Sequence, residues 1–271
     1  MESWVDGRPA SALSLLDRGL AYGDGLFETV LVRNGRPVLF ERHLQRLVDG
    51  CTRLGMPLDL DQVREECGRF AVGLGEGVMK LIVTRGDGLR GYAPLADARP
   101  RRILQGSGAP VWPAAHAEIG VKLFACSTRL AEQPRLAGLK HLNRLEQVLA
   151  RAEWQDATYA EGLVLDHSGR LIEGVFSNLF LVIEGTLCTP DLSRCGVAGV
   201  MRAELLAHVA ERGLAAKVLD LSPEHLGRAT EVFVCNSVYG IWPVIGAGEL
   251  SWSVGPVTRK LQAFSRSILD S

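Results

Sequence analysis

The sequence has no apolar run near the roughly 20 residues that a membrane-spanning helix needs, although 47% of its 271 residues are hydrophobic. Its first ten residues, MESWVDGRPA, contain an early acidic residue and no apolar run. A secretory signal requires such a run. We therefore expect no membrane span and no signal peptide.

The sequence has no excess of positive or negative charge, and it has no closely spaced cysteines. The formal net charge is -1, which gives no general attraction to nucleic acid or anionic membranes. The six cysteines are scattered without a CxxC pair, a pattern typical of neither a zinc site nor a small disulfide scaffold. We expect a reduced, cytoplasmic protein that binds no metal, nucleic acid or membrane.

Strand and helix patterns alternate along the chain. LFETVLVRNGRPVLF predicts two strands around an Asn34-Gly35 turn, and the apolar spacing in residues 60–74 predicts a helix. A longer helix is expected from about Leu142 to Asp156. The glycines and prolines of GSGAPVWP, residues 106–113, interrupt these patterns. The sequence therefore predicts an α/β fold with mixed sheets: a small N-terminal domain (1–106), a linker (107–120) and a larger C-terminal domain (121–271).

Lysine is scarce, with five lysines among the 30 basic residues. Lys140 stands in GLKHLNRLEQ, where a glycine-bearing loop is expected to meet the helix. Such a position can hold the side chain while leaving its amine open to a pocket. Neighbouring cations such as Arg144 would favour the neutral, nucleophilic amine. The alternative from the residues alone is a solvated lysine at a helix start.

Three further features could bind a charged ligand. Glu173, at the end of an expected strand, could pair with a protonated ring nitrogen or could be a surface carboxylate. The glycine-punctuated helix start at Val200 and Met201 could bind a phosphate or could be an ordinary junction. Arg46, at the border of an apolar helix face, could bind phosphate or extend into water.

Together these segments resemble the fold-type IV pyridoxal 5′-phosphate (PLP) enzymes, the superfamily of branched-chain and D-amino-acid aminotransferases. The resemblance runs through DRGLAYGDGLFETV, HLQRL, KLIVTRGDGLRGY, LIEGVFSNLF, GVAGVMR and FVCNSVYGIWPV, and covers nearly the whole chain. KHLNRLEQVLAR is similar to the lyase branch, the aminodeoxychorismate lyases. The resemblance implies a two-domain, D-amino-acid-aminotransferase-like fold, a homodimer, and conversion of 4-amino-4-deoxychorismate into 4-aminobenzoate and pyruvate for folate biosynthesis.

The resemblance also implies roles for individual residues. Lys140 would bind PLP covalently and move the substrate proton, and Glu173 would pair with the pyridine nitrogen. The remaining residues would bind the cofactor phosphate: Arg46, Val200, Met201 and Ser237.

Residues for the substrate are less defined by the motifs. Thr29 is expected to donate a hydrogen bond to the leaving oxygen, although a strand threonine can equally be a packing residue. Cations and polar groups are expected to bind the substrate carboxylates or to face the pocket. These candidates are Arg85, Arg90, Tyr92, Asn236 and Arg144.

Two other functions are compatible with the same residues. One is an aminotransferase of this fold that acts on D-amino or branched-chain amino acids. The other is a non-catalytic phosphate- or nucleotide-binding α/β protein. The glycines of YGDGLFE do not form a dinucleotide-binding fingerprint, since they do not open a helix that follows a strand.

Overall fold

A computed structural model describes residues 2–270. The chain divides into two compact units. Unit 1 contains the chain up to Pro110 and, in addition, the short segment Leu139–Asn143. Unit 2 contains Val111–Gly138 and Arg144–Leu269. The boundary at Pro110 lies within the residues where the sequence predicts a linker, whereas the return of Leu139–Asn143 to unit 1 had no counterpart in the sequence patterns.

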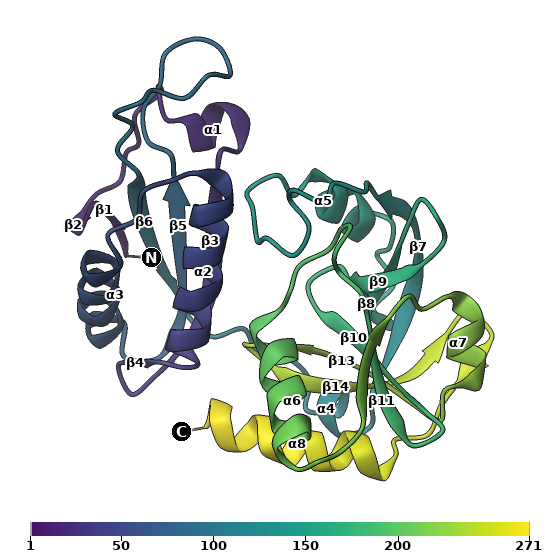
Figure 1. Cartoon of the computed structure of the whole chain (residues 1–271). Helices are drawn as coiled ribbons and strands as arrows, with labels where there is room; N and C mark the ends of the chain where they lie inside the picture. Colours follow the sequence, from purple (N-terminus) through teal and green to yellow (C-terminus); the bar gives the residue numbers. More distant parts are fainter. Residues whose placement is uncertain (1, 271) are drawn as a thin grey trace. The chain divides into compact units, whose positions relative to one another are not determined.

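Unit 1 is a six-stranded antiparallel sheet in the order β2-β1-β6-β5-β3-β4 with two main helices (Figure 1). Its elements are β1 (Ser3–Val5), β2 (Arg8–Pro9), α1 (Arg18–Tyr22), β3 (Gly25–Arg33), β4 (Arg36–Pro37), α2 (Phe40–Leu54), α3 (Leu60–Leu74), β5 (Gly77–Thr84) and β6 (Arg101–Ser107). Asn34 and Gly35 both have positive φ angles, 49° and 70°, and form the predicted turn. The predicted helix 60–74 is confirmed as α3.

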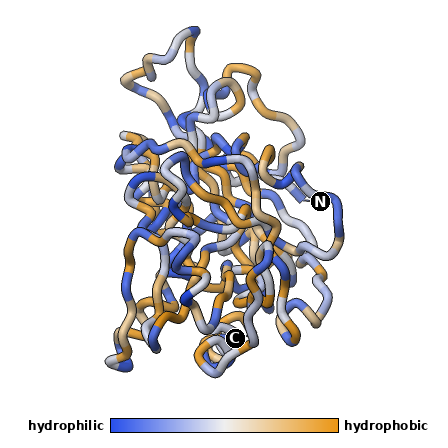
Figure 2. The backbone as a smooth tube through the Cα atoms, turned by 90° about the vertical axis from the view of Figure 1, so that its right-hand side faces the viewer, coloured by the Kyte–Doolittle hydropathy of each residue, from blue (hydrophilic) through white to orange (hydrophobic). Residues whose placement is uncertain are grey.

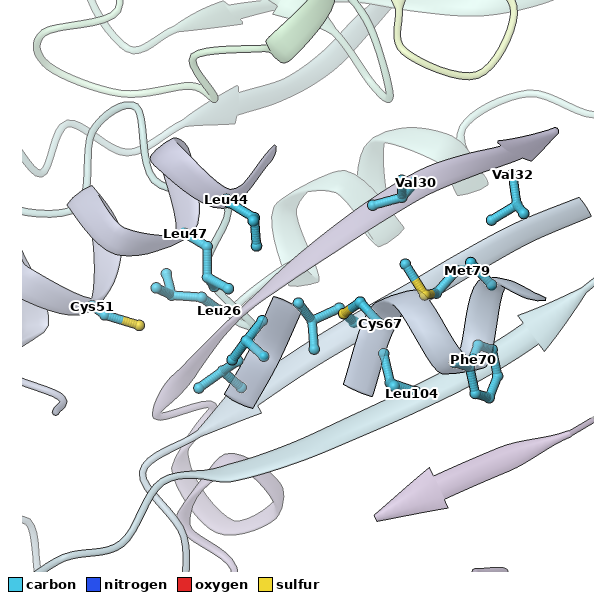
Figure 3. Packing of buried hydrophobic residues seen from close by; sticks show 14 of the residues in the cluster. Leu26, Val30, Val32, Leu44, Leu47, Cys51, Cys67, Phe70, Met79 and Leu104 are labelled. Carbon is cyan, nitrogen blue, oxygen red and sulfur yellow. The ribbon is translucent and has the colours of Figure 1, made fainter. Parts of the chain in front are cut away.

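The core of unit 1 lies between its sheet and the helices α2 and α3. Leu44 and Leu47 reach it from α2, and Phe70 reaches it from α3 (Figure 3). Val30 and Met79 meet them from β3 and β5. Side chains alternate across a strand, so β3 presents Glu28 on this helix-covered face and Phe27 and Thr29 on the opposite face.

Unit 2 contains a nine-stranded sheet of parallel and antiparallel pairs. Its elements are α4 (Ala115–Glu118), β7 (Val121–Leu130), α5 (Leu145–Ala152), β8 (Tyr159–Asp166), β9 (Leu171–Gly174), β10 (Asn178–Ile183), β11 (Thr186–Pro190), α6 (Val200–Glu211), β12 (Ala216–Leu219), α7 (Pro223–Arg228), β13 (Glu231–Asn236), β14 (Gly240–Ala247), β15 (Leu250–Ser251) and α8 (Pro256–Leu269). Strand β9 pairs with both β8 and β10, which closes a circuit of six strands, β10-β13-β14-β7-β8-β9. The closing pair joins Glu173 to Asn178.

The helix expected from Leu142 to Asp156 is wrong in its bounds, because α5 spans only Leu145–Ala152. The backbone just before it is used elsewhere. His141 forms a bridge with Leu26, and the Leu142 N–H donates to the Gly25 carbonyl over 3.0 Å. Pairing with a distant strand has therefore overridden the local helical pattern.

Hydrophobic and hydrophilic residues are interleaved along the whole trace (Figure 2). Within residues 2–270 no helix combines the length and the apolar character that a bilayer crossing requires. All six cysteines are buried and unpaired with one another.

Candidate active site

Lys140 lies in an extended segment that docks on the start of β3 in unit 1. The Phe27 N–H donates to the Lys140 carbonyl over 2.9 Å, and the Asn143 side chain donates to the Gly23 carbonyl over 3.2 Å. The half-buried Lys140 side chain places its Nζ 4.3 Å from the centre of the Phe27 ring. The lysine is thus held by backbone pairing on both sides and by an aromatic face.

A second lysine lies on the same sheet face. Lys80 of β5 is paired in register with Thr29, and its Nζ is 5.2 Å from the centre of the Phe27 ring. Phe27 therefore has an amine from Lys80 and an amine from Lys140 against its ring. This face combines two amines and the hydroxyl of Thr29, and its positive charge suits an anionic ligand.

On the helix-covered face of β3, the buried Glu28 binds Arg46. The Glu28 carboxylate accepts from Arg46 Nε over 2.8 Å and from Arg46 Nη2, and it pairs with His43 Nδ1 over 2.6 Å. Burial alone would raise the pKa of Glu28, but Arg46 and His43 lower it to about 2. Burial lowers the pKa of His43, although its contact with the Glu28 carboxylate acts in the opposite direction. This cluster fixes the orientation of the Arg46 guanidinium.

The loop after β5 contains the other cationic candidates of unit 1. Arg85 is buried, and its guanidinium donates to Asp24, to the Leu54 carbonyl and to the Gly55 carbonyl over 2.8–3.0 Å. Arg90 and Tyr92 are exposed on the following loop.

In unit 2, Glu173 is buried at the end of β9, so the sequence alternative of a surface carboxylate is excluded. Its Oε2 accepts from the Val197 N–H over 2.8 Å. Asn178 Nδ2 donates to the Val197 carbonyl over 2.9 Å. Arg144, which precedes α5, interacts electrostatically with Glu173, and burial lowers the pKa of this arginine.

The start of α6 fits an anion. Its N-cap is Gly199, which has no side chain to occupy the first-turn N–H groups of Val200 and Met201. A Cβ on Gly199 would lie only 1.9 Å from Asn178 Oδ1, so the close approach of the backbone here requires glycine. Gly138 pairs with this loop, since it donates to the Gly196 carbonyl and accepts from the Ala198 N–H.

Asn236 ends β13, and Ser237 begins the turn between β13 and β14. Asn236 Oδ1 accepts from the Val238 and Tyr239 N–H groups over 2.9 and 3.0 Å, and Asn236 Nδ2 donates to the Phe176 carbonyl over 3.3 Å. These bonds use the Asn236 side chain to shape the turn. A hydroxyl at Ser237 can donate to a phosphate oxygen.

Comparison with known proteins identifies what this arrangement belongs to. The sequence profile of the Amino-transferase class IV family matches residues 25–246, a range that includes Lys140, Glu173 and the start of α6. The chain belongs to this family. Among its class IV relatives is the aminodeoxychorismate lyase of Vibrio harveyi, which is 36% identical over 96% of this chain and 97% of the relative.

Solved class IV structures have the same fold, which confirms the predicted mixed α/β class. A 4-amino-4-deoxychorismate lyase from Pseudomonas aeruginosa superposes with a TM-score of 0.97 at 63% identity, covering 99% of this chain and 100% of the other. The branched-chain amino acid aminotransferase of Escherichia coli superposes with a TM-score of 0.83 at 26% identity, covering 96% and 92%.

The structure sorts the predicted residues of this class IV protein into two groups. In unit 1, Lys140 and Thr29 lie on one face of β3, whereas Arg46 lies with Glu28 on the helix-covered face and Arg85 binds the carbonyls at the end of α2. Unit 2 brings Glu173 close to the loop that precedes Val200 and Met201, with Arg144 beside it. Their roles toward a ligand stay predictions.

Sequence reasoning missed several residues of these groups. Lys80 could be found only through its register with Thr29, which depends on β3–β5 pairing. Glu28 lies within FET and His43 within HLQRL, but the sequence alone does not show that they pair. Asn178 had a usable signal, since it is part of the EGVFSNLF run.

Proposed function

We propose that the chain is a PLP-dependent lyase that converts 4-amino-4-deoxychorismate into 4-aminobenzoate and pyruvate, a step of folate biosynthesis. The observation that carries the proposal is the 63% identity to the Pseudomonas aeruginosa lyase over practically the whole of both chains. Identity to the branched-chain aminotransferase is only 26%. The lyase is therefore favoured over an aminotransferase and over a non-catalytic phosphate-binding protein.

The donor set fits the cofactor. Glu173 is a buried acid suited to a protonated ring nitrogen. The α6 start offers backbone N–H groups to a phosphate, and Arg46 and Ser237 would add a guanidinium and a hydroxyl. Lys140 offers the amine for the covalent bond. When bound, PLP supplies an electron sink for negative charge that develops beside the substrate nitrogen.

The residues of the chain would divide the remaining work. Lys140 would accept the proton from the substrate carbon that carries the amino group. The Glu173 carboxylate would stabilise the protonated form of the cofactor's ring nitrogen. Thr29 would donate a hydrogen bond to the ether oxygen as the enolpyruvyl group leaves. Formation of an aromatic ring makes this elimination strongly downhill, so positioning and proton removal are the main requirements.

The substrate carboxylates would be bound by cations of unit 1. Lys80 suits this role because its exposed amine shares a sheet face with Thr29. Arg90 and Tyr92 would contribute from the exposed loop. Arg85 is bonded to Asp24 and to two backbone carbonyls, so we assign to it mainly the anchoring of that loop. In unit 2, Arg144 would contribute its guanidinium, and Asn236 would contribute mainly by shaping the turn that contains Ser237.

Assembly as a homodimer in the cytoplasm is part of the proposal. The exposed apolar side chains of α5, Leu145, Val148 and Leu149, support a partner surface, because contiguous exposed apolar patches often mark interaction sites. Light scattering would test the assembly, with a monomer for Val148→Glu as the expected result.

The decisive test is a supply of enzymatically made aminodeoxychorismate with detection of pyruvate. The unaltered chain should release pyruvate, and Lys140→Ala should lower turnover by on the order of 10³-fold or more, because it removes both the covalent attachment and the base. Lys260→Ala, on the exposed side of α8, is the control and should retain full activity.

Two results would contradict the proposal. Retained turnover in Lys140→Ala would remove the mechanism. Rapid formation of a new amino acid from D-alanine or leucine with 2-oxoglutarate, at rates above pyruvate release, would favour an aminotransferase instead.

A further inference from the structure

Glu161 of β8 is fully buried and accepts four hydrogen bonds. Its carboxylate binds the N–H groups of Gly162 (2.8 Å), Val175 (3.0 Å) and Phe176 (3.4 Å) and the hydroxyl of Ser177 (2.7 Å). Three of these donors belong to the turn between β9 and β10. The Glu161 carboxylate therefore binds all three residues of this turn, Val175–Ser177.

The two ends of that turn hold the loop before α6. Glu173, at its start, accepts from the Val197 N–H, and Asn178, at its end, donates to the Val197 carbonyl. Gly174 packs directly on the buried acid, since a Cβ there would lie 2.2 Å from Ser177 Oγ and 2.9 Å from the Glu161 carboxylate. A shift of the turn would move Glu173 and the anion-binding loop together.

The same turn also contacts the β13–β14 turn. The Phe176 carbonyl accepts from Asn236, the neighbour of Ser237. Tyr239 interacts electrostatically with Glu161 and lies beside Ser177 of the same turn. The cofactor contacts proposed for unit 2 thus lie close along the chain to groups that Glu161 or its turn holds: Glu173 precedes the turn, Val200 and Met201 follow Val197, and Ser237 follows Asn236.

We propose that Glu161 is a positioning residue for the cofactor site: by holding the turn Val175–Ser177 it sets the orientation of Glu173 and of the Val197 loop. This inference rests on the proposed function, since it assigns a role toward the same bound group. Glu161 itself would not contact the ligand.

The ionised form of Glu161 matches its surroundings. Burial raises the pKa of Glu161 to about 7, and the four donors act in the opposite direction. All four partners are N–H or O–H donors, so an ionised carboxylate can accept from each of them. A glutamine would turn an NH₂ group toward N–H donors and leave buried groups unpaired.

A matched control exists in the same unit. Glu231 is also a buried β-strand glutamate, and it accepts from the N–H groups of Val257 (3.1 Å) and Thr258 (2.7 Å). It lies at the other end of β13 from Asn236. Glu231→Gln should therefore cost stability without disturbing the turns of the site.

The test measures binding of pyridoxamine 5′-phosphate, which forms no covalent bond with Lys140 and so reports the non-covalent contacts. Dissociation constants would be obtained by tryptophan fluorescence for the unaltered chain, Glu161→Gln and Glu231→Gln, with urea unfolding of each. Loss of groups that orient metal ligands typically weakens metal binding by roughly 10- to 100-fold. By analogy we expect about tenfold weaker binding for Glu161→Gln and less than about twofold for Glu231→Gln.

The outcomes separate the two proposals. Equal affinity in the unaltered chain and Glu161→Gln would overturn the positioning role alone, as would equal weakening in both variants. Failure of the unaltered chain to bind would overturn the proposed function. If Glu161→Gln does not fold, Glu161→Asp keeps the charge but withdraws it from the turn, and binding about threefold weaker is expected; unchanged binding would overturn the role.

Discussion

The two units offer different kinds of groups to a ligand. Unit 1 offers cationic side chains, Lys140, Lys80 and Arg46, whereas unit 2 offers backbone N–H groups and a buried acid, Glu173. Side chains of unit 1 are oriented by other side chains, as Glu28 orients Arg46. Backbone groups of unit 2 are oriented by close packing, as Asn178 and Gly199 show. Substitutions in unit 1 and in unit 2 should therefore differ in how they affect stability, ligand binding and turnover.

After Lys140, the largest effect on turnover should come from Glu173, the acid of unit 2. Glu173→Gln keeps an acceptor for the Val197 N–H but cannot hold a proton on a ring nitrogen. We expect kcat for pyruvate release to fall by on the order of 10²-fold, with the urea midpoint little changed. A fall in stability without a fall in kcat would make Glu173 a structural residue and would end the contrast between the units.

Glu28, the buried acid of unit 1, should instead contribute to the free energy of unfolding. Its pKa is lowered to about 2 from 4.5, so the stabilisation is fully present above pH 4.5 and is lost as pH falls toward 2. The shift corresponds to roughly 3 kcal/mol. Glu28→Gln should lower the free energy of unfolding by about this amount at pH 7 and by less as the pH falls below 4.5.

Urea unfolding from pH 7 to pH 3 checks this expectation, because the difference between Glu28→Gln and the unaltered chain should shrink with acid. The variant should also bind PLP more weakly, since Arg46 loses its orienting partner. A pH-independent difference would contradict the ionised pairing of Glu28 with Arg46.

The same contrast explains how far the sequence could predict the structure. Local signals sufficed for α3 and for the Asn34-Gly35 turn, because periodicity and positive φ preferences act within a few residues. The helical pattern extended wrongly to Leu142, where the backbone instead pairs with Gly25 at the start of β3, more than a hundred positions away. Backbone pairing of that kind leaves no local pattern.

The site shows a similar division. Motifs placed Lys140, Glu173 and Arg46, but they could not separate Arg85 from Arg90, two loop arginines that look alike in sequence. Only the fold shows that Arg85 is buried against Asp24 while Arg90 is exposed. Glu161 had no signal, since its partners belong to a different strand and turn.

The backbone-built part of unit 2 can be tested with two glycines. In Gly199→Ala the new Cβ would meet Asn178 Oδ1 at 1.9 Å, whereas at Gly227 of α7 nothing lies within 4 Å of a Cβ. We expect Gly199→Ala to lose about 1–3 kcal/mol of stability and to bind PLP more weakly. Gly227→Ala should gain up to about 1 kcal/mol from helix propensity and bind normally. Thermal unfolding and PLP titration of both variants would test this expectation. Equal stability and equal PLP affinity of the two variants would argue against a close-packed anion-binding loop.

The smallest effect is expected for the exposed loop of unit 1, where one cation among several would contact the substrate. Arg90→Met removes a solvated guanidinium, so stability should stay within about 0.5 kcal/mol. KM for aminodeoxychorismate should rise several-fold with kcat nearly unchanged, because a carboxylate contact made equally in substrate and transition state affects binding alone.

Arg85→Met is the matched comparison, since it removes a buried guanidinium with three internal acceptors and should mainly lower stability. If Arg85→Met raised KM while leaving stability intact, the division between anchoring and substrate-binding arginines would be reversed.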